Sequence, residues 1–284
     1  MRILVKIGGA QLEEPQQRAQ LCKALAKARA EGHELVVVHG GGNQIRQLTR
    51  ALQLPEAYVD GLRVTDQRTA EVVLMVLGGS VNRTLVHALQ QAGVPAVGLS
   101  GADGGTFTAK KLEHPKGDLG FVGVVDHVNP QLVQSLLHSG YVPVIATTSP
   151  GSAPGSAPGS ASGSEPFFNL NADHAAGPLC RAFGCDALLF LTDVPAVLDA
   201  QKQRLPVLTP TDCERLVASG VASGGMLPKL DAALMALREN PRALVKIAPG
   251  NNPDTNSGAV LAALRSGVGT TFTTETAQAE THHG

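Results

Sequence analysis

The sequence predicts an α/β fold in which helices cover both faces of a mainly parallel sheet. Short apolar runs of strand length alternate with longer segments of helical periodicity through most of the 284 residues. Strands that alternate with helices form parallel sheets, because each helix carries the chain back to the edge where the previous strand began. Glycine-rich turns follow several of these runs, as is typical of open α/β sheets that bind ligands.

The expected elements follow this alternation in order. Strands are expected at residues 3–7, 34–38, 94–99, 141–146, 187–191 and 243–247. Helices are expected at residues 16–31, 44–52, 66–92, 130–139, 173–183 and 227–239. Gly32 and Gly93 are suited to end the first and third helices, and Asp66 is suited to cap the start of the third. Residues 110–125 consist of short pieces broken by glycines, which indicates an antiparallel hairpin inserted among the βα units.

Two segments differ from this pattern. Residues 149–164 read SPGSAPGSAPGSASGS, a repeat of small residues that cannot build a core, so we expect a flexible loop there. Because the repeat ends shortly before Asn169, it is either an inert spacer or a lid, and its lack of anchoring side chains favours the spacer. The polar residues 274–284 are expected to form a disordered tail. Neither segment marks a boundary, so residues 1–273 are expected to form a single domain.

Composition and charge exclude several classes of protein. The 23 basic and 24 acidic residues give a net charge of −1, which offers no electrostatic footprint for nucleic acid or an acidic membrane surface. No apolar run approaches the roughly 18 residues that a membrane-spanning helix needs, and the chain enters a strand pattern directly rather than a secretory signal. The four scattered cysteines are expected to be reduced core thiols. These features indicate a cytoplasmic protein.

Three glycine-rich turns each follow an expected strand, at residues 8–9, 40–42 and 98–101. Glycine lets backbone N–H groups approach a ligand closely, and the N-terminus of a following helix favours anions. The turns do not match the common nucleotide fingerprints, because no Gly-Lys-Ser/Thr occurs and neither of the first two turns extends to GxGxxG.

A lipase-like hydrolase is an alternative, because HGGG at residues 39–42 is also a sequence that forms oxyanion holes. That fold requires a GxSxG turn for its nucleophile. The nearest stretch, GLSGA at residues 98–102, ends in alanine, which disfavours the hydrolase.

A set of motifs along the chain resembles the amino-acid kinase family. The motifs are VKIGGA at 5–10, VVVHGGGNQI at 36–45, GLRVTD at 61–66, VLGGSVNRTLV at 76–86, VGLSGADG at 97–104, FVGVV at 121–125, NLNAD at 169–173, LTDVPAVL at 191–198 and GGMLPKLDAAL at 224–234. One such motif would be weak, but the ordered set spans nearly the whole chain. The resemblance is to members that phosphorylate the side-chain carboxylate of N-acetyl-L-glutamate with ATP, in arginine biosynthesis.

The resemblance also implies an architecture. It implies a three-layer αβα sandwich around a central, mainly parallel eight-stranded sheet. The half up to about residue 175 is implied to bind the acyl amino acid and to form a homodimer, and residues 176–273 are implied to bind ATP, with Mg²⁺ arriving on the nucleotide. No helical extension precedes Arg2, and because such extensions accompany arginine-inhibited hexamers in the family, an arginine-insensitive dimer is expected.

Other members of the family leave alternatives open. Close relatives phosphorylate N-succinyl-glutamate, or glutamate or aminoadipate linked to a carrier protein. A non-catalytic regulatory member of the fold is a further alternative. The presence of both expected lysines, Lys6 and Lys229, together with Asp173, argues against this last one.

Phosphoryl transfer between two anions needs positioning and positive charge more than covalent help. Lys6 ends a buried apolar strand beside two glycines, an unusual place for a solvated lysine, and by resemblance it stabilises charge on the transferring phosphoryl group. Lys229 is implied to contact the nucleotide phosphates and to share this task. Asp173 is implied to organise both lysines, and it is also suited to cap the helix at 173–183.

Arg63 is the expected substrate-recognition residue, because a guanidinium can hold a carboxylate through two parallel hydrogen bonds. Asn169 resembles the side chain that binds the α-amino and α-carboxylate end of the substrate. The remaining implied site residues are Gly41 and Gly42 for the acyl amino acid, and Gly8, Gly9, Thr192, Asp193 and Val194 for the nucleotide. His39 is expected to be structural. Residues 248–255 depart from the family pattern, so no base contact is predicted there.

Overall fold

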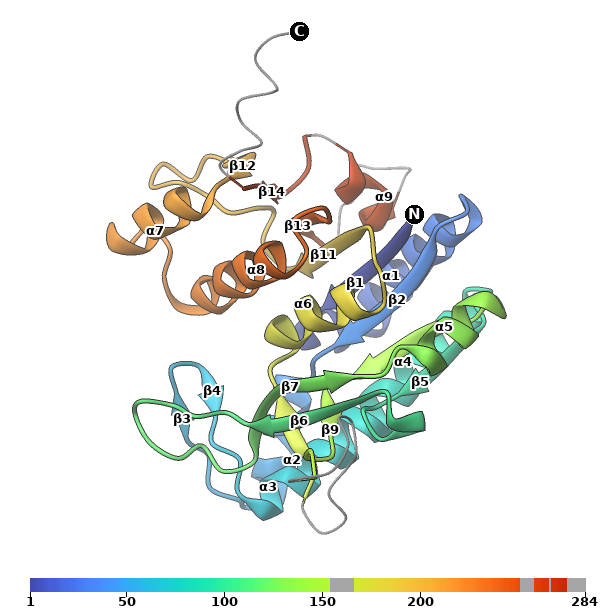
Figure 1. The fold of residues 1–284 in the computed structure, drawn as a ribbon, viewed down its shortest axis with the longest axis vertical. Helices are drawn as coiled ribbons and strands as arrows, with labels where there is room; N and C mark the ends of the chain where they lie inside the picture. The colour runs from blue at the N-terminus through green and yellow to red at the C-terminus, as the bar shows by residue number, and fades with distance from the viewer. Residues whose placement is uncertain (154–165, 251–257, 266, 275–284) are drawn as a thin grey trace, which may run out of the picture.

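The computed structural model describes residues 1–153, 166–250, 258–265 and 267–274, and an eight-stranded sheet forms its centre (Figure 1). The strand order is β12-β14-β13-β11-β1-β2-β8-β5. The strands are β1 (Arg2–Ile7), β2 (Glu34–His39), β5 (Ala96–Leu99), β8 (Val142–Ala146), β11 (Ala187–Thr192), β12 (Val207–Leu208), β13 (Leu244–Pro249) and β14 (Thr270–Phe272). All neighbours pair in parallel except β13 and β14, so the mainly parallel sheet is confirmed.

Strand β1 lies inside the sheet, between β11 and β2, which explains its continuous apolar sequence. Its side chains alternate between two hydrophobic cores. Ile3 and Val5 belong to one core, and Leu4 belongs to the other. Lys6 is two residues after Leu4 and therefore faces the same side of the sheet as Leu4.

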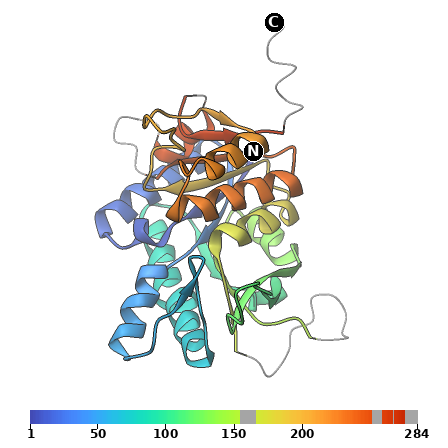
Figure 2. The ribbon, with the colours of Figure 1, turned by 90° about the vertical axis from the view of Figure 1, so that its left-hand side faces the viewer.

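Helices cover both faces of the sheet (Figure 1 and Figure 2). Those on the side of Val5 include α1 (Pro15–Ala30), α4 (Asn82–Gln91) and α9 (Gly258–Leu264). Those on the side of Leu4 include α5 (Gln131–His138), α6 (Ala172–Ala182), α7 (Pro210–Ala218) and α8 (Leu227–Glu239). Helices α6 and α8 pack closely, because a Cβ at Gly177 would lie only 3.1 Å from Cα of Ala236. The predicted three-layer sandwich is confirmed.

The expected long helix is helical throughout and contains a π-helical segment. It consists of α3 (Gln67–Val73), η2 (Leu74–Val81) and α4, and a short β-hairpin separates it from α2 (Gly42–Ala51). The predicted cap is confirmed, because Oδ1 of Asp66 accepts a hydrogen bond from the backbone N of Thr69 at 2.8 Å. Gln67–Gln91 is long and apolar enough to cross a membrane. Its most apolar 18-residue stretch has a mean hydropathy of 1.5, and 44% of that stretch is buried inside the protein. The expectation that no stretch reaches this length is therefore wrong, and many of its apolar side chains serve the core.

Two smaller sheets lie in the lower part of the view in Figure 1, below the central strands β1 and β11. The first has the order β6-β7-β10-β9, and its strands are β6 (Phe107–Lys111), β7 (Val122–Val128), β9 (Thr148–Ser149) and β10 (Phe168–Leu170). Strands β6 and β7 pair antiparallel, which confirms the predicted hairpin. The second is the hairpin of β3 (Tyr58–Val59) and β4 (Leu62–Arg63), whose two-residue turn, Asp60-Gly61, has φ of 49° and 81°.

The expectation of a flexible loop at residues 149–164 is wrong for the first residues of this segment. Ser149 belongs to β9 and is fully buried, and the hydroxyl of Ser152 donates a hydrogen bond to Asp126 at 2.7 Å. Residues 154–164, and the tail from residue 275 onwards, lie outside the described residues.

Several short elements were not expected from the sequence: α7, α9, β3, β4, β9, β10, β12 and β14. Among these elements, α7 carries a clear capping signal. Pro210 occupies its first turn, and Thr209 and Asp212 form a capping box in which each side chain bonds the other residue's backbone N–H.

Candidate active site

A cavity of about 440 Å³ opens at the carboxyl ends of β1, β2 and β11. Of the predicted site residues, it is lined by Lys6, Gly8, Gly9, Gly41, Gly42, Arg63, Asn169, Asp173, Thr192, Asp193 and Lys229. Val194 is the one predicted site residue that does not line it. Residues from both halves of the chain therefore meet at one edge of the sheet, where open α/β sheets bind their ligands.

Lys6 and Asp173 form a buried ion pair at the cavity wall. Nζ of Lys6 lies 2.7 Å from Oδ1 of Asp173, and the two side chains are 6% and 12% exposed. Burial alone would raise the pKa of Asp173, but the positive charges of Lys6 and Lys229 outweigh it and hold that pKa below its usual range. The carboxylate is therefore ionised and holds the ammonium of Lys6 in place.

Asp173 does not cap helix α6, so that predicted role is wrong. The N-cap is Asn171, whose Oδ1 accepts hydrogen bonds from the backbone N of Asp173 at 2.8 Å and of His174 at 3.3 Å. Asparagine and aspartate cap helices equally well, so the sequence NLNAD offered both. Because Asn171 satisfies the helix end, the carboxylate of Asp173 is left to face Lys6.

Lys229 lines the cavity from the first turn of α8, in the C-terminal half of the chain. Its side chain is partly exposed, and Nζ donates to the carbonyl O of Gly225 at 3.4 Å. Its charge lowers the pKa of Asp173 without direct contact. The structure thus brings Lys6 and Asp173 into contact and places Lys229 near them.

The glycine turns after β1 and β2 touch through their backbones. A Cβ at Gly9 would lie 2.8 Å from Cα of Gly41, so a larger residue cannot fit without moving the chain. Nε2 of Gln44 donates to the carbonyl O of Gly9 at 3.0 Å and ties α2 to the first turn. A Cβ at Gly8 would meet nothing within 4 Å, so Gly8 leaves open space beside the cavity.

Arg63 is almost completely buried, with 8% of the residue exposed. Nη2 donates to the carbonyl O of Gly42 at 3.1 Å, and Nη1 lies 3.4 Å from Oε2 of Glu56. The guanidinium also stacks on the ring of Tyr58, with Cζ 4.8 Å from the ring centroid. These contacts hold its planar fork at the cavity wall.

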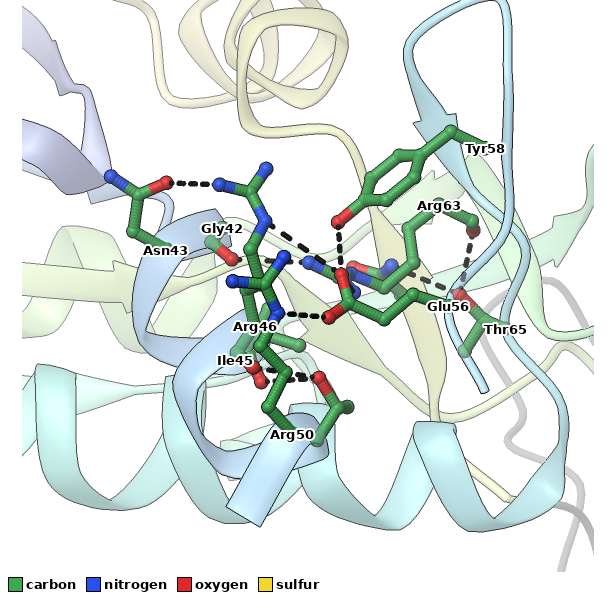
Figure 3. A network of polar contacts seen from close by, with 11 residues as sticks. Gly42, Asn43, Ile45, Arg46, Arg50, Glu56, Tyr58, Arg63 and Thr65 are labelled. Carbon is green, nitrogen blue, oxygen red and sulfur yellow. Dashed lines mark hydrogen bonds and ion pairs between the residues drawn. The ribbon is translucent and has the colours of Figure 1, made fainter. Parts of the chain in front are cut away.

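Asn169 is linked to Arg63 through Thr65, whose contact with Arg63 is drawn in Figure 3. Nδ2 of Asn169 donates to Oγ1 of Thr65 at 3.2 Å, and this hydroxyl donates to the carbonyl O of Arg63 at 2.9 Å. The two predicted substrate residues, distant in sequence, are therefore positioned by one hydrogen-bonded chain.

The side of the cavity at the end of β11 is more open. At the end of β11, Oγ1 of Thr192 donates to Oδ1 of Asp193 at 2.8 Å, and Asp193 is exposed. Residues 251–257, which follow β13, lie outside the described residues.

Sequence reasoning missed several cavity residues, among them Asn43, Arg46 and Tyr58. Asn43 and Arg46 lie three residues apart on one face of α2, and Nη1 of Arg46 donates to Oδ1 of Asn43 at 3.2 Å. Tyr58 pairs with Arg63 across the β3–β4 hairpin. The Asp-Gly turn of this hairpin is a recognisable signal that would have placed Tyr58 opposite Arg63.

The cavity carries a surplus of positive charge. Among the described residues that line it, the cations are Lys6, Arg46, Arg63 and Lys229, and the carboxylates are Asp173 and Asp193. Such a surplus favours anionic ligands. No group of three or more His, Cys, Asp or Glu side chains that could hold a metal ion occurs in the described part of the chain.

The hydrolase alternative finds no support in the geometry. The hydroxyl of Ser100 donates to Oδ2 of Asp103 at 2.7 Å, not to a histidine. His39 is completely buried, and burial lowers its pKa to about 4 despite the hydrogen bond to the carbonyl of Gly40. Nε2 of His39 lies 3.0 Å from Nδ2 of Asn82, which makes His39 a structural residue beneath the second glycine turn.

The fold and this cavity define a ligand-binding α/β protein with a cationic site at the carboxyl ends of its central strands. The chain belongs to the amino acid kinase family, whose profile matches residues 1–246. It is 42% identical over 253 residues to an acetylglutamate kinase of Solibacter usitatus (strain Ellin6076), which covers 89% of this chain and 93% of that protein. It is 41% identical over 238 residues to an acetylglutamate kinase of Koribacter versatilis (strain Ellin345), covering 84% and 87%.

Solved structures have the same fold. The protein smu.665 from Streptococcus mutans UA159 superposes with a TM-score of 0.78 at 25% identity, covering 96% of this chain and 98% of that one. Carbamate kinase from Giardia lamblia bound to AMP-PNP superposes with a TM-score of 0.68 at 16% identity, covering 96% and 98%. The second likeness shows the fold alone.

Proposed function

We propose that this chain acts as an acetylglutamate kinase of arginine biosynthesis, which transfers the γ-phosphoryl group of ATP to the side-chain carboxylate of N-acetyl-L-glutamate. The product is N-acetyl-L-glutamyl 5-phosphate. The observation that carries this proposal is that Lys6, Asp173, Lys229 and Arg63 line one cavity. Identities of 40–42% to acetylglutamate kinases over most of the chain support the choice of substrates.

The transfer needs little covalent chemistry from the protein. One oxygen of the acceptor carboxylate donates an electron pair to the γ-phosphorus, and the bond from phosphorus to the bridging oxygen breaks, leaving its electrons on ADP. The acceptor is already ionised at neutral pH, so no general base is required. Negative charge spreads over the phosphoryl oxygens, and Lys6 and Lys229 stabilise it from two walls of the cavity.

The remaining predicted residues position the reactants. The carboxylate of Asp173 orients Lys6, and the backbone amides of Gly8, Gly9, Gly41 and Gly42 surround the reacting groups. Arg63 and Asn169 bind the α-carboxylate and α-amino end of the acyl amino acid. The half up to about residue 175 thus holds the acceptor. The half at 176–273 holds ATP through Thr192, Asp193 and Lys229. Val194, the residue after Asp193, does not line the cavity.

We place Mg²⁺ on the nucleotide rather than in a protein cage. The cation would screen charge between the β- and γ-phosphates, and the lysines and glycine amides would hold the phosphates themselves. The protein is proposed to act in the cytoplasm, where ATP is supplied.

We propose that the protein forms a homodimer through its N-terminal half, as the family resemblance implies. Two surface features of that half support the proposal. Strand β5 is an edge of the main sheet, and Met75 is 54% exposed on the long helix. Light scattering after size exclusion should give twice the chain mass, and Met75→Lys should shift the population towards the monomer. A monomeric wild type would contradict the proposal.

An ADP-release assay with a panel of acceptors tests the function directly. N-acetyl-L-glutamate should support turnover, and L-glutamate, which lacks the acyl group, should support far less. N-succinyl-L-glutamate distinguishes the acyl group. Equal rates with no acceptor and with N-acetyl-L-glutamate would contradict the proposal and favour the regulatory alternative.

A further inference from the structure

Four side chains surround Glu56 beside the cavity (Figure 3). Glu56 lies between α2 and β3 and accepts hydrogen bonds from Nε of Arg50 at 2.8 Å and from the hydroxyl of Tyr58 at 3.2 Å. Its Oε2 also lies 3.4 Å from Nη1 of Arg63 and 3.7 Å from Nε of Arg46. One carboxylate therefore joins guanidinium groups from helix α2 and from strand β4.

The contact with Arg63 is the shielded one. The side chains of Arg63 and Glu56 are 7% and 16% exposed, whereas those of Arg46 and Arg50 are 41% and 71% exposed. Arg50 makes the shortest contact with Glu56, but water and salt screen the ion pairs of exposed side chains, so the contact with Arg63 is the least screened of the three. Loss of the charge on Glu56 would leave the guanidinium of Arg63 without its counterion in a poorly hydrated place.

The contacts of Arg63 leave some N–H donors of its guanidinium group available to a ligand. Glu56 and the carbonyl of Gly42 each take one N–H group, and Tyr58 covers one face of the guanidinium. A guanidinium has five N–H donors, so further donors remain for a substrate carboxylate at the cavity that Arg63 lines.

The charge balance of the cluster depends on Glu56. Three guanidinium groups repel one another, and Glu56 is the carboxylate that contacts all three. Burial would raise the pKa of Glu56, but Arg50, Tyr58 and Arg63 together hold it below the usual range, so the carboxylate is ionised at neutral pH.

We infer that Glu56 is a positioning residue that holds the fork of Arg63, and with it the β3–β4 hairpin, against α2 in the orientation that binds the substrate carboxylate. The inference rests on the proposed function, because it takes Arg63 to be the group that binds this carboxylate. Glu56 acts through Arg63 and touches no reacting atom. If Glu56 instead competed with the substrate for Arg63, its removal would tighten substrate binding.

The test uses Glu56→Gln, which keeps the shape and removes the charge. We expect the KM for N-acetyl-L-glutamate to rise about tenfold, with the KM for ATP and kcat within about twofold of the wild type. Glu56→Asp restores the charge on a shorter side chain and should recover part of the loss.

Asp60→Asn is the matched control. Asp60 lies on the same hairpin, pairs with Lys116 and His114, and does not contact Arg63. Its φ of 49° suits asparagine, so the turn is kept. The control should leave both KM values unchanged, and thermal unfolding checks that each variant is folded.

An unchanged KM for the acyl amino acid in Glu56→Gln overturns the inference, and a lowered KM shows competition instead. An equal rise in both KM values, or an equal effect of Asp60→Asn, also overturns it.

Combination of Glu56→Gln with Arg63→Lys separates this inference from the proposed function. If Arg63→Lys alone leaves the KM unchanged, the assignment of Arg63 fails, while wild-type ADP release still reports the kinase activity. If Arg63→Lys raises the KM, Glu56→Gln should add little to it, and full additivity contradicts the positioning role.

Discussion

The two lysines of the cavity differ in how they are held. Lys6 is 5% exposed and paired with Asp173 at 2.7 Å. Lys229 is partly exposed, and among the hydrogen bonds that the structure describes it donates only to the carbonyl of Gly225, just before α8. We therefore propose that the cavity wall that holds Lys6, the acceptor wall, is organised before ligands arrive, and that the nucleotide completes the wall that holds Lys229, the nucleotide wall. A buried charge in place costs no reorganisation during the reaction.

Replacement of either lysine gives the largest expected effect. Lys6→Ala and Lys229→Ala should each lower kcat about 100- to 1,000-fold, as does loss of one oxyanion-hole donor, and should change KM much less. Steady-state kinetics check this, with Lys23→Ala on the exposed face of α1 as the control. A variant with near-wild-type kcat would remove that lysine from the mechanism.

Lys6→Ala and Lys229→Ala should also differ in their free energy of unfolding. Lys6→Ala leaves the carboxylate of Asp173 buried without its partner, which typically costs about 3–5 kcal/mol. Lys229→Ala should leave the free energy of unfolding within about 0.5 kcal/mol of the wild type, as surface substitutions do. Urea unfolding measures both, and equal losses would contradict the difference between the two walls.

The folded protein should lose stability in acid because of His39, which lies beneath the second glycine turn. Its pKa is about 4 in the folded protein and 6.5 in an ordinary environment. The unfolded chain therefore binds the proton first, so stability is fully present above pH 6.5 and is lost as the pH falls towards 4. The loss is on the order of 3 kcal/mol at about 1.4 kcal/mol per pKa unit.

Urea unfolding at pH 7, 6 and 5 measures this loss, and His39→Gln should flatten the slope. Asp173 does not account for such a slope, because its lowered pKa places its contribution below its ordinary value of 3.8. If the free energy of unfolding of His39→Gln fell with pH as steeply as that of the wild type, another group would be responsible for the loss.

The contact between the glycine turns predicts that alanine substitutions at the neighbouring residues Gly9 and Gly8 differ in their effect on stability. Gly9→Ala should destabilise the protein by about 1–3 kcal/mol, because its Cβ meets the backbone of Gly41. Gly8→Ala meets nothing within 4 Å and should fold normally. Thermal unfolding compares them, and a raised KM for ATP in Gly8→Ala would show that the ligand fills the space beside Gly8.

The smallest expected effect concerns recognition. Arg63→Lys keeps the charge and loses the planar fork, so the KM for N-acetyl-L-glutamate should rise about tenfold and the KM for ATP should stay nearly constant. An equal rise in both values would contradict the assignment of Arg63 to the acceptor wall.

Regular elements and the motif residues were predictable from the sequence, and short or tertiary features were not. Strand parity alone places Lys6 on the side of the sheet where α6 and α8 lie. Two good capping residues in NLNAD left the choice between Asn171 and Asp173 open. Strands of two or three residues, such as β9 and β10, are too short to show a period. The cluster around Glu56 forms only when the hairpin folds onto α2, which no local pattern reports.

The most direct test of carboxylate phosphorylation is to trap the product with hydroxylamine. An acyl phosphate reacts with hydroxylamine to give a hydroxamate, whereas a phosphate ester or free phosphate does not. With ATP and N-acetyl-L-glutamate, the wild type should form hydroxamate in step with ADP, and both products should fall together in Lys6→Ala and Lys229→Ala. ADP release without hydroxamate would contradict transfer to the side-chain carboxylate.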